Sequence, residues 1–496
     1  MRKTGSADLH LSSLVSGISF VEGSPASRWV DLLCSEDRQA SDVEGGEAQT
    51  LTSKLLMKAL SVINDLAAGL DLGSEKIHGS IAGGTPRVFG TFTADVLALR
   101  DWLLEQKVAT VAMEATGIYW LAVYEVLEAA GLQPIVVNGK HVKNLPGRKT
   151  DMSDCQWLAT LHAHGLLRAS FVPEAAIRRL QDYMRLRGDH ISMAATHVQH
   201  CQKALERMNL KIHDVISQLT GASGQAIIRA ILAGERNPER LVALADKAVL
   251  KTKRERLLAA MQGQWKPEHL FALKQAFELW EFYQQKIQEC DQQIAALLAE
   301  MNQGRPSAPA TSGRRKRQSG HNAPKIEGLH DHLRQLCGGA DATQLPGFAD
   351  YSVLMLISEV GTDLSRWPTE KHFTAWLGLA PASHQSGKRR GRVSRHRNRA
   401  GRIFCTIARS LARSVDKALG GFYRRLRARR GGLIANQALA RKLAALYWRT
   451  FVKGLQHVET GLAAYQQALA AQQHRFAQKL AAKLGCQLVP IPVVHG

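Results

Sequence analysis

Apolar residues between positions 66 and 167 follow two periodicities, one typical of strands and one typical of helices. Short apolar runs predict strands at 67–73, 77–82, 87–92, 108–113 and 134–137. Helical spacing predicts helices at 94–105, 118–130 and 151–167. Because strands and helices alternate, this part of the chain is predicted to form a sheet with helices packed on it.

Length and local pattern divide the 496 residues into several parts, since one core rarely serves so long a chain. The first 56 residues are rich in Ser, Gly, Asp and Glu and have no sustained period, so they are a disordered extension or precede a true start at Met57. We expect an N-terminal extension at 1–56, an α/β domain at 57–174, a helical connector at 175–301, a flexible basic linker at 302–340 and a mainly α-helical domain at 341–496.

The end of the connector has the seven-residue repeat of a coiled coil. Two alternatives stay open, an intramolecular helical hairpin and a dimer seam. The repeat consists of Leu273, Trp280, Ile287 and Ile294, with Ala276, Tyr283, Cys290 and Leu297 between them.

The C-terminal domain opens with QLPGFADYSVLMLISEVGTDLSRW, which is similar to a helix-hairpin-helix element. The turn at Pro346 and Gly347 would offer backbone N–H groups to a phosphate at a helix N-terminus. A plain turn before a core helix is the alternative.

Charge points to a polyanionic partner. The net charge is +22 and the isoelectric point is near 9.9. Between Ser386 and Arg430 there are 16 Lys and Arg and one acid, Asp416, so this segment carries 16 − 1 = +15. A solubilising surface is the alternative to nucleic acid binding, but solubility rarely needs a block of one sign. The expected phosphate-binding residues are Lys388, Arg389, Arg390, Arg392, Arg395, Arg397, Arg399 and Arg402.

Composition excludes several other classes of protein. The seven cysteines are scattered without a CxxC pair, which argues against a zinc knuckle or a disulfide scaffold and favours the cytoplasm. No stretch approaches the ~20 continuous apolar residues of a membrane span. We therefore expect a cytoplasmic, nucleoid-associated protein with no membrane partner.

Four acids are the candidate catalytic residues. Asp71 and Glu114 each end an apolar strand and precede small residues, while Asp151 and Asp154 share one face at a helix start. A carboxylate in an apolar strand costs several kcal/mol unless it is paired or metal-bound. Any single acid could be structural, and Asp151 could cap its helix. Together the four predict a site for Mg²⁺, because all ligands are oxygens. Two ions are expected, as in two-metal cleavage of a phosphodiester.

Three strands followed by β-α-β-α is the order of an RNase H-like domain, and the acids fall where that fold holds metal. The segments GLDLGSEK, AMEATGIYW and GRKTDMSDCQWLATL resemble the RuvC-like DEDD domain of transposases of the insertion sequence 110 family, which includes the 1111 group. QLPGFADYSVLMLISEVGTDLSRWPTEKHFTAWLGLAP and HQSGKRRGRVSRHRNRAGR resemble the second domain of that family, which carries a Ser-Gly motif.

The resemblance implies a mechanism that spacing alone does not reveal. It implies that Asp71, Glu114, Asp151 and Asp154 bind magnesium and that Ser386 attacks DNA to give a phosphoserine intermediate. It also implies a guide RNA encoded beside the gene. Ser383 and Ser394 lie near Ser386 and compete with it on sequence alone. A homodimer or homotetramer is expected, with Ser386 meeting the carboxylates in a composite site.

The sequence therefore predicts an RNA-guided transposase that acts on the ends of its element and on target DNA. Two alternatives stay open. One is a RuvC-like, metal-dependent nuclease or junction resolvase in which water attacks. The other is a non-catalytic nucleic-acid-binding derivative of a transposase.

Overall fold

The computed structural model describes residues 61–115, 117–139, 154–308, 320, 322–381, 385–386, 389–390, 397–412 and 419–487. These residues belong to two compact units, the first ending at Val172 and the second beginning at Pro173. The second unit thus holds both the expected connector and the expected C-terminal domain. The extension expected at 1–56 and the alternative start at Met57 lie outside the described residues.

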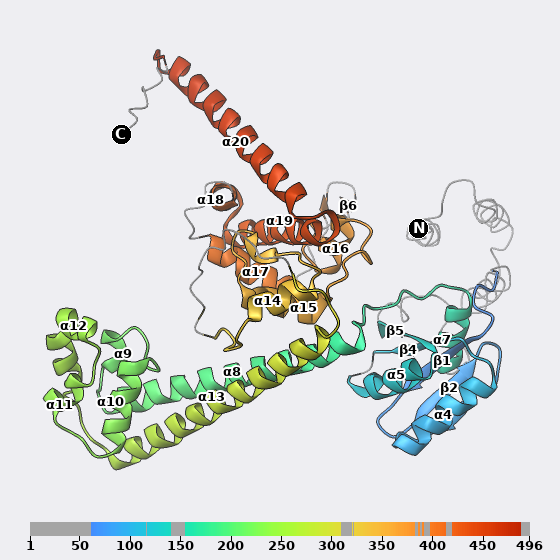
Figure 1. Ribbon diagram of the computed structural model, residues 1–496, viewed down its shortest axis with the longest axis horizontal. Coiled ribbons are helices and arrows are strands. Elements are labelled where there is room, and N and C mark those ends of the chain that lie inside the picture. Colours follow the sequence, from blue (N-terminus) through green and yellow to red (C-terminus); the bar gives the residue numbers. More distant parts are fainter. Residues whose placement is uncertain are drawn as a thin grey trace, which may run out of the picture. The chain divides into compact units, whose positions relative to one another are not determined.

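The first unit is built on a five-stranded mixed sheet (Figure 1). Its elements are β1 (Ala67–Leu72), β2 (Ile77–Ile81), β3 (Arg87–Phe89), α4 (Thr93–Glu105), β4 (Thr110–Glu114), α5 (Tyr119–Ala129), β5 (Gln133–Val137) and α7 (Asp154–Ala163). The strand order is β3-β2-β1-β4-β5, with β1 antiparallel to β2 and parallel to β4, and β4 parallel to β5. The sheet and its helices are compatible with the RNase H-like domain predicted from the sequence.

The two faces of the sheet carry different helices. Alternate residues of β1, such as Leu70, pack in one core with Leu99 of α4 and Leu127 of α5. The other face of the sheet packs against α7, where Leu158 lies in a second core with Val137 of β5. Since side chains alternate along a strand, this second face receives the odd-numbered residues of β1.

The helix predicted at 151–167 is shorter than expected. Its last residue is Ala163, and Gly165 follows in the left-handed region with φ +67°. The apolar residues that extended the predicted period therefore lie beyond the helix end. Ala169 then forms an antiparallel bridge to Val137, so the chain after α7 runs along β5.

Two long helices of the second unit, α8 (Ala175–Arg207) and α13 (Pro267–Met301), pack along each other (Figure 1). This packing is compatible with the intramolecular hairpin, one of the two alternatives for the seven-residue repeat, and the choice between them stays a prediction. Tyr283 and Ile287 of the repeat are partly buried and pack against the hydrophobic core at the tip of this hairpin. The buried members of the repeat are Leu273, Ala276, Trp280, Cys290, Ile294 and Leu297.

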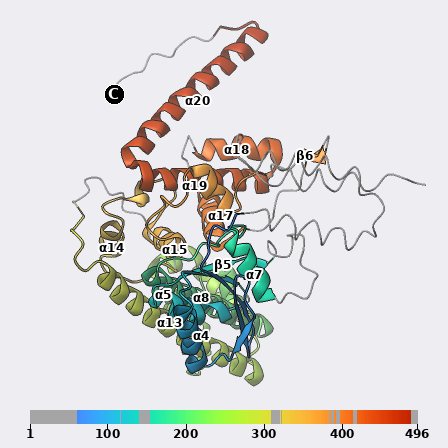
Figure 2. The same ribbon diagram turned by 90° about the vertical axis from the view of Figure 1, so that its right-hand side faces the viewer.

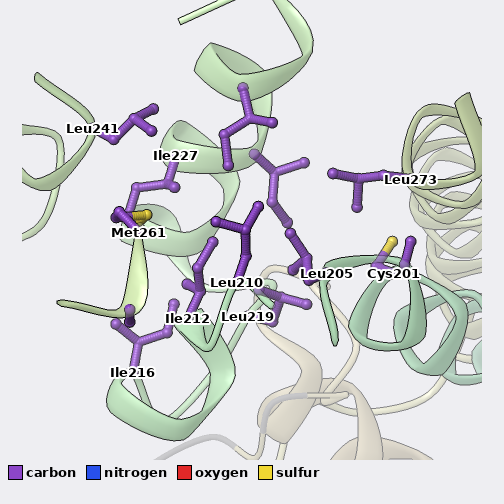
Figure 3. Close-up of a cluster of buried hydrophobic side chains, with 14 of the residues drawn as sticks. Cys201, Leu205, Leu210, Ile212, Ile216, Leu219, Ile227, Leu241, Met261 and Leu273 are labelled. Atoms are coloured by element: carbon purple, nitrogen blue, oxygen red, sulfur yellow. The ribbon is translucent and has the colours of Figure 1, made fainter. Parts of the chain in front are cut away.

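A small helical head joins the two long helices at the tip of the hairpin. It consists of α9 (Ile212–Val215), α10 (Ala222–Leu232), α11 (Pro238–Ala243) and α12 (Lys247–Ala260). Figure 3 shows its core, a cluster that includes Ile227 and Met261 of the head together with Leu205 of α8 and Leu273 of α13. The head therefore shares one hydrophobic core with the tip of the hairpin.

A buried ion pair links the hairpin to the helices that follow. Arg187 of α8 lies 2.6 Å from Asp291 of α13, and their side chains are 1% and 5% exposed. The Arg187 guanidinium also donates to the Tyr351 hydroxyl at 3.2 Å, and the Lys325 amide donates to Asp291 at 3.0 Å. Since an unpaired buried charge is very unfavourable, this network holds the hairpin against the C-terminal helices.

The C-terminal part is mainly helical, as predicted. Its elements are α14 (Leu329–Leu336), a 3₁₀ turn η1 (Ala342–Gln344), α15 (Asp350–Val360), α16 (Glu370–Trp376), β6 (Gln385–Ser386), β7 (Arg389–Arg390), α17 (Arg399–Leu411), α18 (Leu419–Arg430), α19 (Gly432–Lys453) and α20 (Leu455–Lys483). Phe348, Phe404 and Tyr447 meet in the core with ring centroids about 6 Å apart, at 6.1, 5.9 and 5.6 Å.

The prediction of a flexible linker throughout 302–340 is wrong for residues 329–336, which form helix α14. Within it, α14 buries Leu329, Leu333 and Leu336, so this stretch is part of the folded unit. The eight residues of this amphipathic helix follow a Pro/Gly/Ser-rich sequence, and the linker prediction was extended from that sequence across the helix. Residues 309–319 and 321 of the same stretch lie outside the described part of the chain.

The turn at Pro346 and Gly347 precedes α15 and faces the core. Gly347 has φ +85°, and a Cβ there would lie 2.8 Å from Leu411 of α17. The Phe348 amide is already used by the Leu345 carbonyl at 3.2 Å. The helix-hairpin-helix assignment stays a prediction.

Among the helices of the described ranges, none combines the length and apolar composition that crossing a bilayer requires.

Candidate active site and nucleic-acid surface

Asp71 and Glu114 lie side by side on neighbouring parallel strands. The register pairs Leu70 of β1 with Met113 of β4, so the next residues along, Asp71 and Glu114, are opposite each other. Neighbouring strands lie ~4.8 Å apart, and residues in the same register point to the same face. Both carboxylates therefore start from adjacent points on the α7 face, at the edge where the parallel strands end.

Both side chains are partly buried, and neither has a hydrogen bond or ion pair among the described residues. The Glu114 carboxylate occupies the space beside Gly139, just beyond β5. A Cβ on Gly139 would lie 1.8 Å from Glu114 Oε1, so only glycine admits the carboxylate there. Two neighbouring carboxylates without a partner form an electronegative point on the sheet edge, which suits a bound cation.

Helix α7 brings the third acid to this face. A Cβ on Gly69 of β1 would lie 2.3 Å from the Ala159 nitrogen and 2.4 Å from the Cys155 oxygen, so the α7 backbone lies directly on the strand. Asp154 is the first residue of α7 and is exposed. Because Cys155 follows it and touches Gly69, Asp154 begins the helix near the strand that carries Asp71. Asp151 lies outside the described residues.

The sequence interpretation missed His78. It is the β2 partner of Asp71 in the antiparallel register, so its partly buried side chain shares the α7 face. An imidazole beside two carboxylates is a candidate for holding water or phosphate in this site. The alternation of side chains along β2 could have assigned His78 to one face of its strand. Its position beside Asp71, however, follows only from the register between β1 and β2.

A different group meets a strict geometric test for a metal site. Among the described residues, three ligand atoms come within 4.8 Å of one another at Glu206, His213 and Asp214, in the helical head. Asp71, Glu114 and Asp154 are not gathered that closely as their side chains stand. Glu206 already pairs with Lys211 and, at 2.8 Å, with His213, so this second group is an ion-pair cluster on the surface.

Ser386 lies at the end of a small β-hairpin. It is the last residue of β6, and its backbone partner in β7 is Arg389. Gly387 and Lys388 stand between the two strands in the sequence and lie outside the described residues. The hairpin was not predicted from the sequence. Ser383 and Ser394, the competing serines, lie outside the described residues and outside both strands.

The expected phosphate-binding residues fall into three groups. Lys388, Arg392 and Arg395 lie outside the described residues, and Arg389 and Arg390 form strand β7. Arg399 and Arg402 are exposed on the first turn of α17. Asn398 caps this helix by accepting a hydrogen bond from the Gly401 amide at 2.8 Å.

Arg397 is partly buried, unlike Arg399 and Arg402. Its guanidinium donates to Gln437 of α19 at 2.9 Å, so it ties the segment before α17 to the helical core. Further along α17, Arg409 is exposed on the same side as Arg402, seven residues away. The following helix α18 exposes five more arginines, at Arg424, Arg425, Arg427, Arg429 and Arg430. Together these residues make the C-terminal unit strongly basic along α17 and α18.

Burial changes the chemistry of three groups outside this surface. It raises the pKa of the Cys201 and Cys337 thiols to about 12, so both stay protonated. It lowers the pKa of His162 in α7, whose Nε2 lies 2.8 Å from the Thr110 hydroxyl. His162 is therefore a neutral structural residue that links α7 to the first residue of β4, whereas Asp71 lies near the last residue of β1.

Two family models match the chain. Residues 68–210 match a transposase model of the DEDD type named for the insertion sequence IS110. Residues 341–424 match the model described as "Transposase IS116/IS110/IS902 family". The first match covers the sheet, α7 and α8, and the second covers η1 to the start of α18. Among curated proteins, no significant match was found.

Proposed function

The chain belongs to the insertion sequence 110 family of transposases, and we propose that it cuts and rejoins DNA with a carboxylate tetrad and a serine nucleophile. Membership of this family makes it a DNA-recombining enzyme. The observation that carries the proposed chemistry is the pair Asp71 and Glu114, two carboxylates at adjacent register positions near the start of α7, neither of which has an ion-pair partner within the part of the chain that the structure describes.

The donor set suits magnesium. Asp71, Glu114, Asp151 and Asp154 offer only carboxylate oxygens, the ligands that hard divalent ions prefer. Family members of the DEDD type depend on divalent metal, and magnesium, as two ions, is the identity we propose. When bound, the metal would neutralise phosphate charge and favour ionisation of a nearby hydroxyl. Asp154, at the exposed start of α7, is the residue best placed to adjust its position as DNA enters.

Ser386 is the proposed nucleophile. Its Oγ attacks the scissile phosphorus, an Oγ–P bond forms, and the bond from phosphorus to one deoxyribose oxygen breaks. The serine proton passes to a base or water, and the leaving oxygen takes up a proton to become a free hydroxyl. The reverse attack by a hydroxyl of another strand restores Ser386 and seals the new junction. No ATP is needed because one phosphoester bond replaces another at each step.

The hairpin suits this role. The register of the hairpin pairs the backbone of Ser386 with that of Arg389, and Arg390 follows in the same strand. Guanidinium groups bind phosphate oxygens through paired N–H donors and can hold the backbone in position. Ser386 must then meet the tetrad in a composite site, supplied by the same or another subunit of a homodimer or homotetramer.

The basic surface of α17 and α18 would hold nucleic acid. Exposed Arg399 and Arg402 lie on α17, the helix that follows the Ser386 hairpin in the sequence, and further exposed arginines lie on α18. Phosphate contacts of this kind position the duplex without reading its sequence. Sequence choice is therefore assigned to a guide RNA that pairs with the element ends and the target, as the family resemblance implies.

The specific alternative is a metal-dependent nuclease in which water attacks and Ser386 has no covalent role. A suicide DNA substrate separates the two mechanisms. The full chain is incubated with Mg²⁺, RNA transcribed from the non-coding flank of the gene, and DNA containing a nicked element end. We expect a covalent protein–DNA adduct at Ser386, identified by mass spectrometry, that Ser386→Ala abolishes and Ser394→Ala preserves.

Asp71→Asn should abolish both cleavage and the adduct while DNA binding persists. Cleavage by Ser386→Ala at the wild-type rate, with no adduct in any variant, would establish the water-attack alternative. Binding without cleavage in the wild-type protein under all these conditions would favour the non-catalytic alternative.

A further inference from the structure

Helix α20 is largely uncovered in its C-terminal half, as far as the burial of its residues is described. It runs for 29 residues, ~43 Å, away from the end of α19. Figures 1 and 2 show it projecting from the C-terminal helices in both views. From position 467 to 487, every residue whose burial is described is exposed except Ala477 and Ala481, which are partly exposed. A lone helix of this kind is only marginally stable in water.

One side of α20 carries an apolar stripe. Phe476, Leu480 and Leu484 are 69%, 48% and 69% exposed, and they follow one another at four-residue spacing. In the sequence, apolar residues at helical intervals of three, four and seven continue toward the N-terminus of the helix at Leu455, Val458, Leu462 and Leu469. Such a stripe on an exposed helix marks an interaction surface rather than ordinary surface variation.

Charge along α20 is polarised. Its one acid in the sequence, Glu459, lies in the second turn, and its bases, Arg475, Lys479 and Lys483, lie in the last three turns. Two copies side by side in parallel would bring like charges together at the C-terminal end. Two antiparallel copies would place the acid of one beside the bases of the other, and their helix dipoles would also oppose.

The antiparallel register centred on Leu469 is complementary in both respects. Positions whose numbers add to 938 then lie opposite each other. This register puts Glu459 opposite Lys479, Val458 opposite Leu480 and Leu462 opposite Phe476. In this register apolar positions lie opposite apolar positions and the acid lies opposite a base, so the sequence of α20 is complementary to itself. A two-fold axis requires this kind of self-complementarity.

We propose that α20 is a dimerisation helix that packs antiparallel against α20 of a second copy of this chain, with the two-fold axis near Leu469. Both family matches end before α20, the second at residue 424. The pairing does not depend on the proposed chemistry, since neither Ser386 nor the carboxylates take part. It would join two C-terminal units through an element outside the parts of the chain that define the family.

Site-specific disulfides test the orientation. Two versions of the full chain, with Cys34→Ser and Cys486→Ser to remove background thiols, carry Glu459→Cys or Lys479→Cys and different tags. We expect a mixed disulfide when the two versions are combined, and at least tenfold less when either version is oxidised alone. A disulfide formed by Glu459→Cys with itself would overturn the antiparallel arrangement.

Sedimentation tests the apolar surface. Phe476→Asp with Leu480→Asp should abolish the mixed disulfide and shift the protein to a smaller species at micromolar concentration. Gln467→Asp with Gln478→Asp adds the same charge on the opposite side of α20 and should change neither result. If the first double variant keeps its oligomeric state and instead loses only bound nucleic acid, the surface belongs to nucleic acid and the proposal fails.

An intramolecular partner is the remaining outcome. If residues 1–60 covered the stripe, wild-type protein would stay monomeric, and their removal would expose it. Monomeric wild-type protein with no mixed disulfide would therefore overturn the pairing.

Discussion

Replacing Gly69 by alanine should displace α7 and the acid that it carries. An added Cβ would stand 2.3 Å from the Ala159 nitrogen, whereas ordinary contact begins near 3.4 Å. The gap to be opened is 3.4 − 2.3, about 1 Å. Because both close atoms, the Ala159 nitrogen and the Cys155 oxygen, are backbone, no side-chain rotation relieves the overlap. The whole helix must move away from β1.

The free energy of unfolding should fall by about 1–2 kcal/mol. Overpacking of this kind typically costs about 1–3 kcal/mol. Replacing glycine within a strand returns ~0.5–1 kcal/mol through lower entropy of the unfolded chain. For a unit of this size the net effect lowers the melting temperature by roughly 5–10 °C. Differential scanning calorimetry of the full chain measures this change directly.

The effect on cleavage should be larger than the effect on stability. Asp154 begins α7, so a helix shift of about 1 Å moves its carboxylate relative to Asp71. A misplacement of that size in a catalytic site can reduce the rate by ~100-fold. DNA cleavage at a temperature well below the melting transition should therefore fall by one to two orders of magnitude, while DNA affinity is retained.

Gly79→Ala is the matched control. Gly79 lies on β2, and its added Cβ would meet side-chain atoms of Trp102 and Leu70 at 3.1 and 3.2 Å. These atoms can yield by a few tenths of an ångström, so a change below ~1 kcal/mol and near-normal cleavage are expected. Wild-type stability and cleavage in Gly69→Ala would refute the close docking of α7 on β1.

Asp291→Ala leaves the Arg187 guanidinium buried without its anion, so denaturant unfolding of the second unit should show a loss of ~3–5 kcal/mol; a loss below 1 kcal/mol would refute the buried pair. Burial lowers the pKa of His162 in the folded state, so the unfolded state binds more protons as pH falls below ~6.5. Urea unfolding should therefore show stability falling from pH 7 to 5.5, and His162→Gln should flatten that slope. Replacing Arg399 and Arg402 together by alanine should reduce the slope of log K against log[salt] for duplex DNA by about 2 in fluorescence anisotropy.

The salt experiment has a control within the same unit. Arg229 is also an exposed arginine, but it pairs with Glu281 at 2.6 Å in the helical head. Arg229→Ala should leave the salt slope unchanged. If Arg229→Ala lowers the salt slope as much per arginine as the double substitution of Arg399 and Arg402 does, DNA affinity depends on net charge alone. The surface on α17 then has no special role.

Strands and helices of the first unit could be predicted because each carries a clear local pattern. β1 alternates between two faces, and its acid falls at the strand end in sequence and structure alike. The end of α7 could not be predicted in the same way. Leu166 and Leu167 continue the helical period, but Gly165 takes up a left-handed conformation that ends the helix. One backbone torsion decided the boundary, and periodicity contains no such information.

The arrangement of the site depends on register, which a single sequence does not specify. Strand ends placed Asp71 and Glu114 at one edge of the sheet, but their direct adjacency required the pairing of β1 with β4. The same pairing logic brings in His78, whose side chain no motif singled out. The Ser386 hairpin spans only two residues per strand. A segment that short, within a run of arginines, has no hydrophobic alternation from which to predict it.

We expect the carboxylates on the α7 face to bind a divalent cation. Titration of the full chain with Mn²⁺, followed by electron paramagnetic resonance, tests it without any nucleic acid. Binding should be saturable, Asp71→Asn and Glu114→Gln should each weaken it at least tenfold, and His213→Ala in the helical head should leave it intact. Binding that survives both carboxylate substitutions, or that disappears with His213→Ala, would show that the cation binds elsewhere than at Asp71 and Glu114.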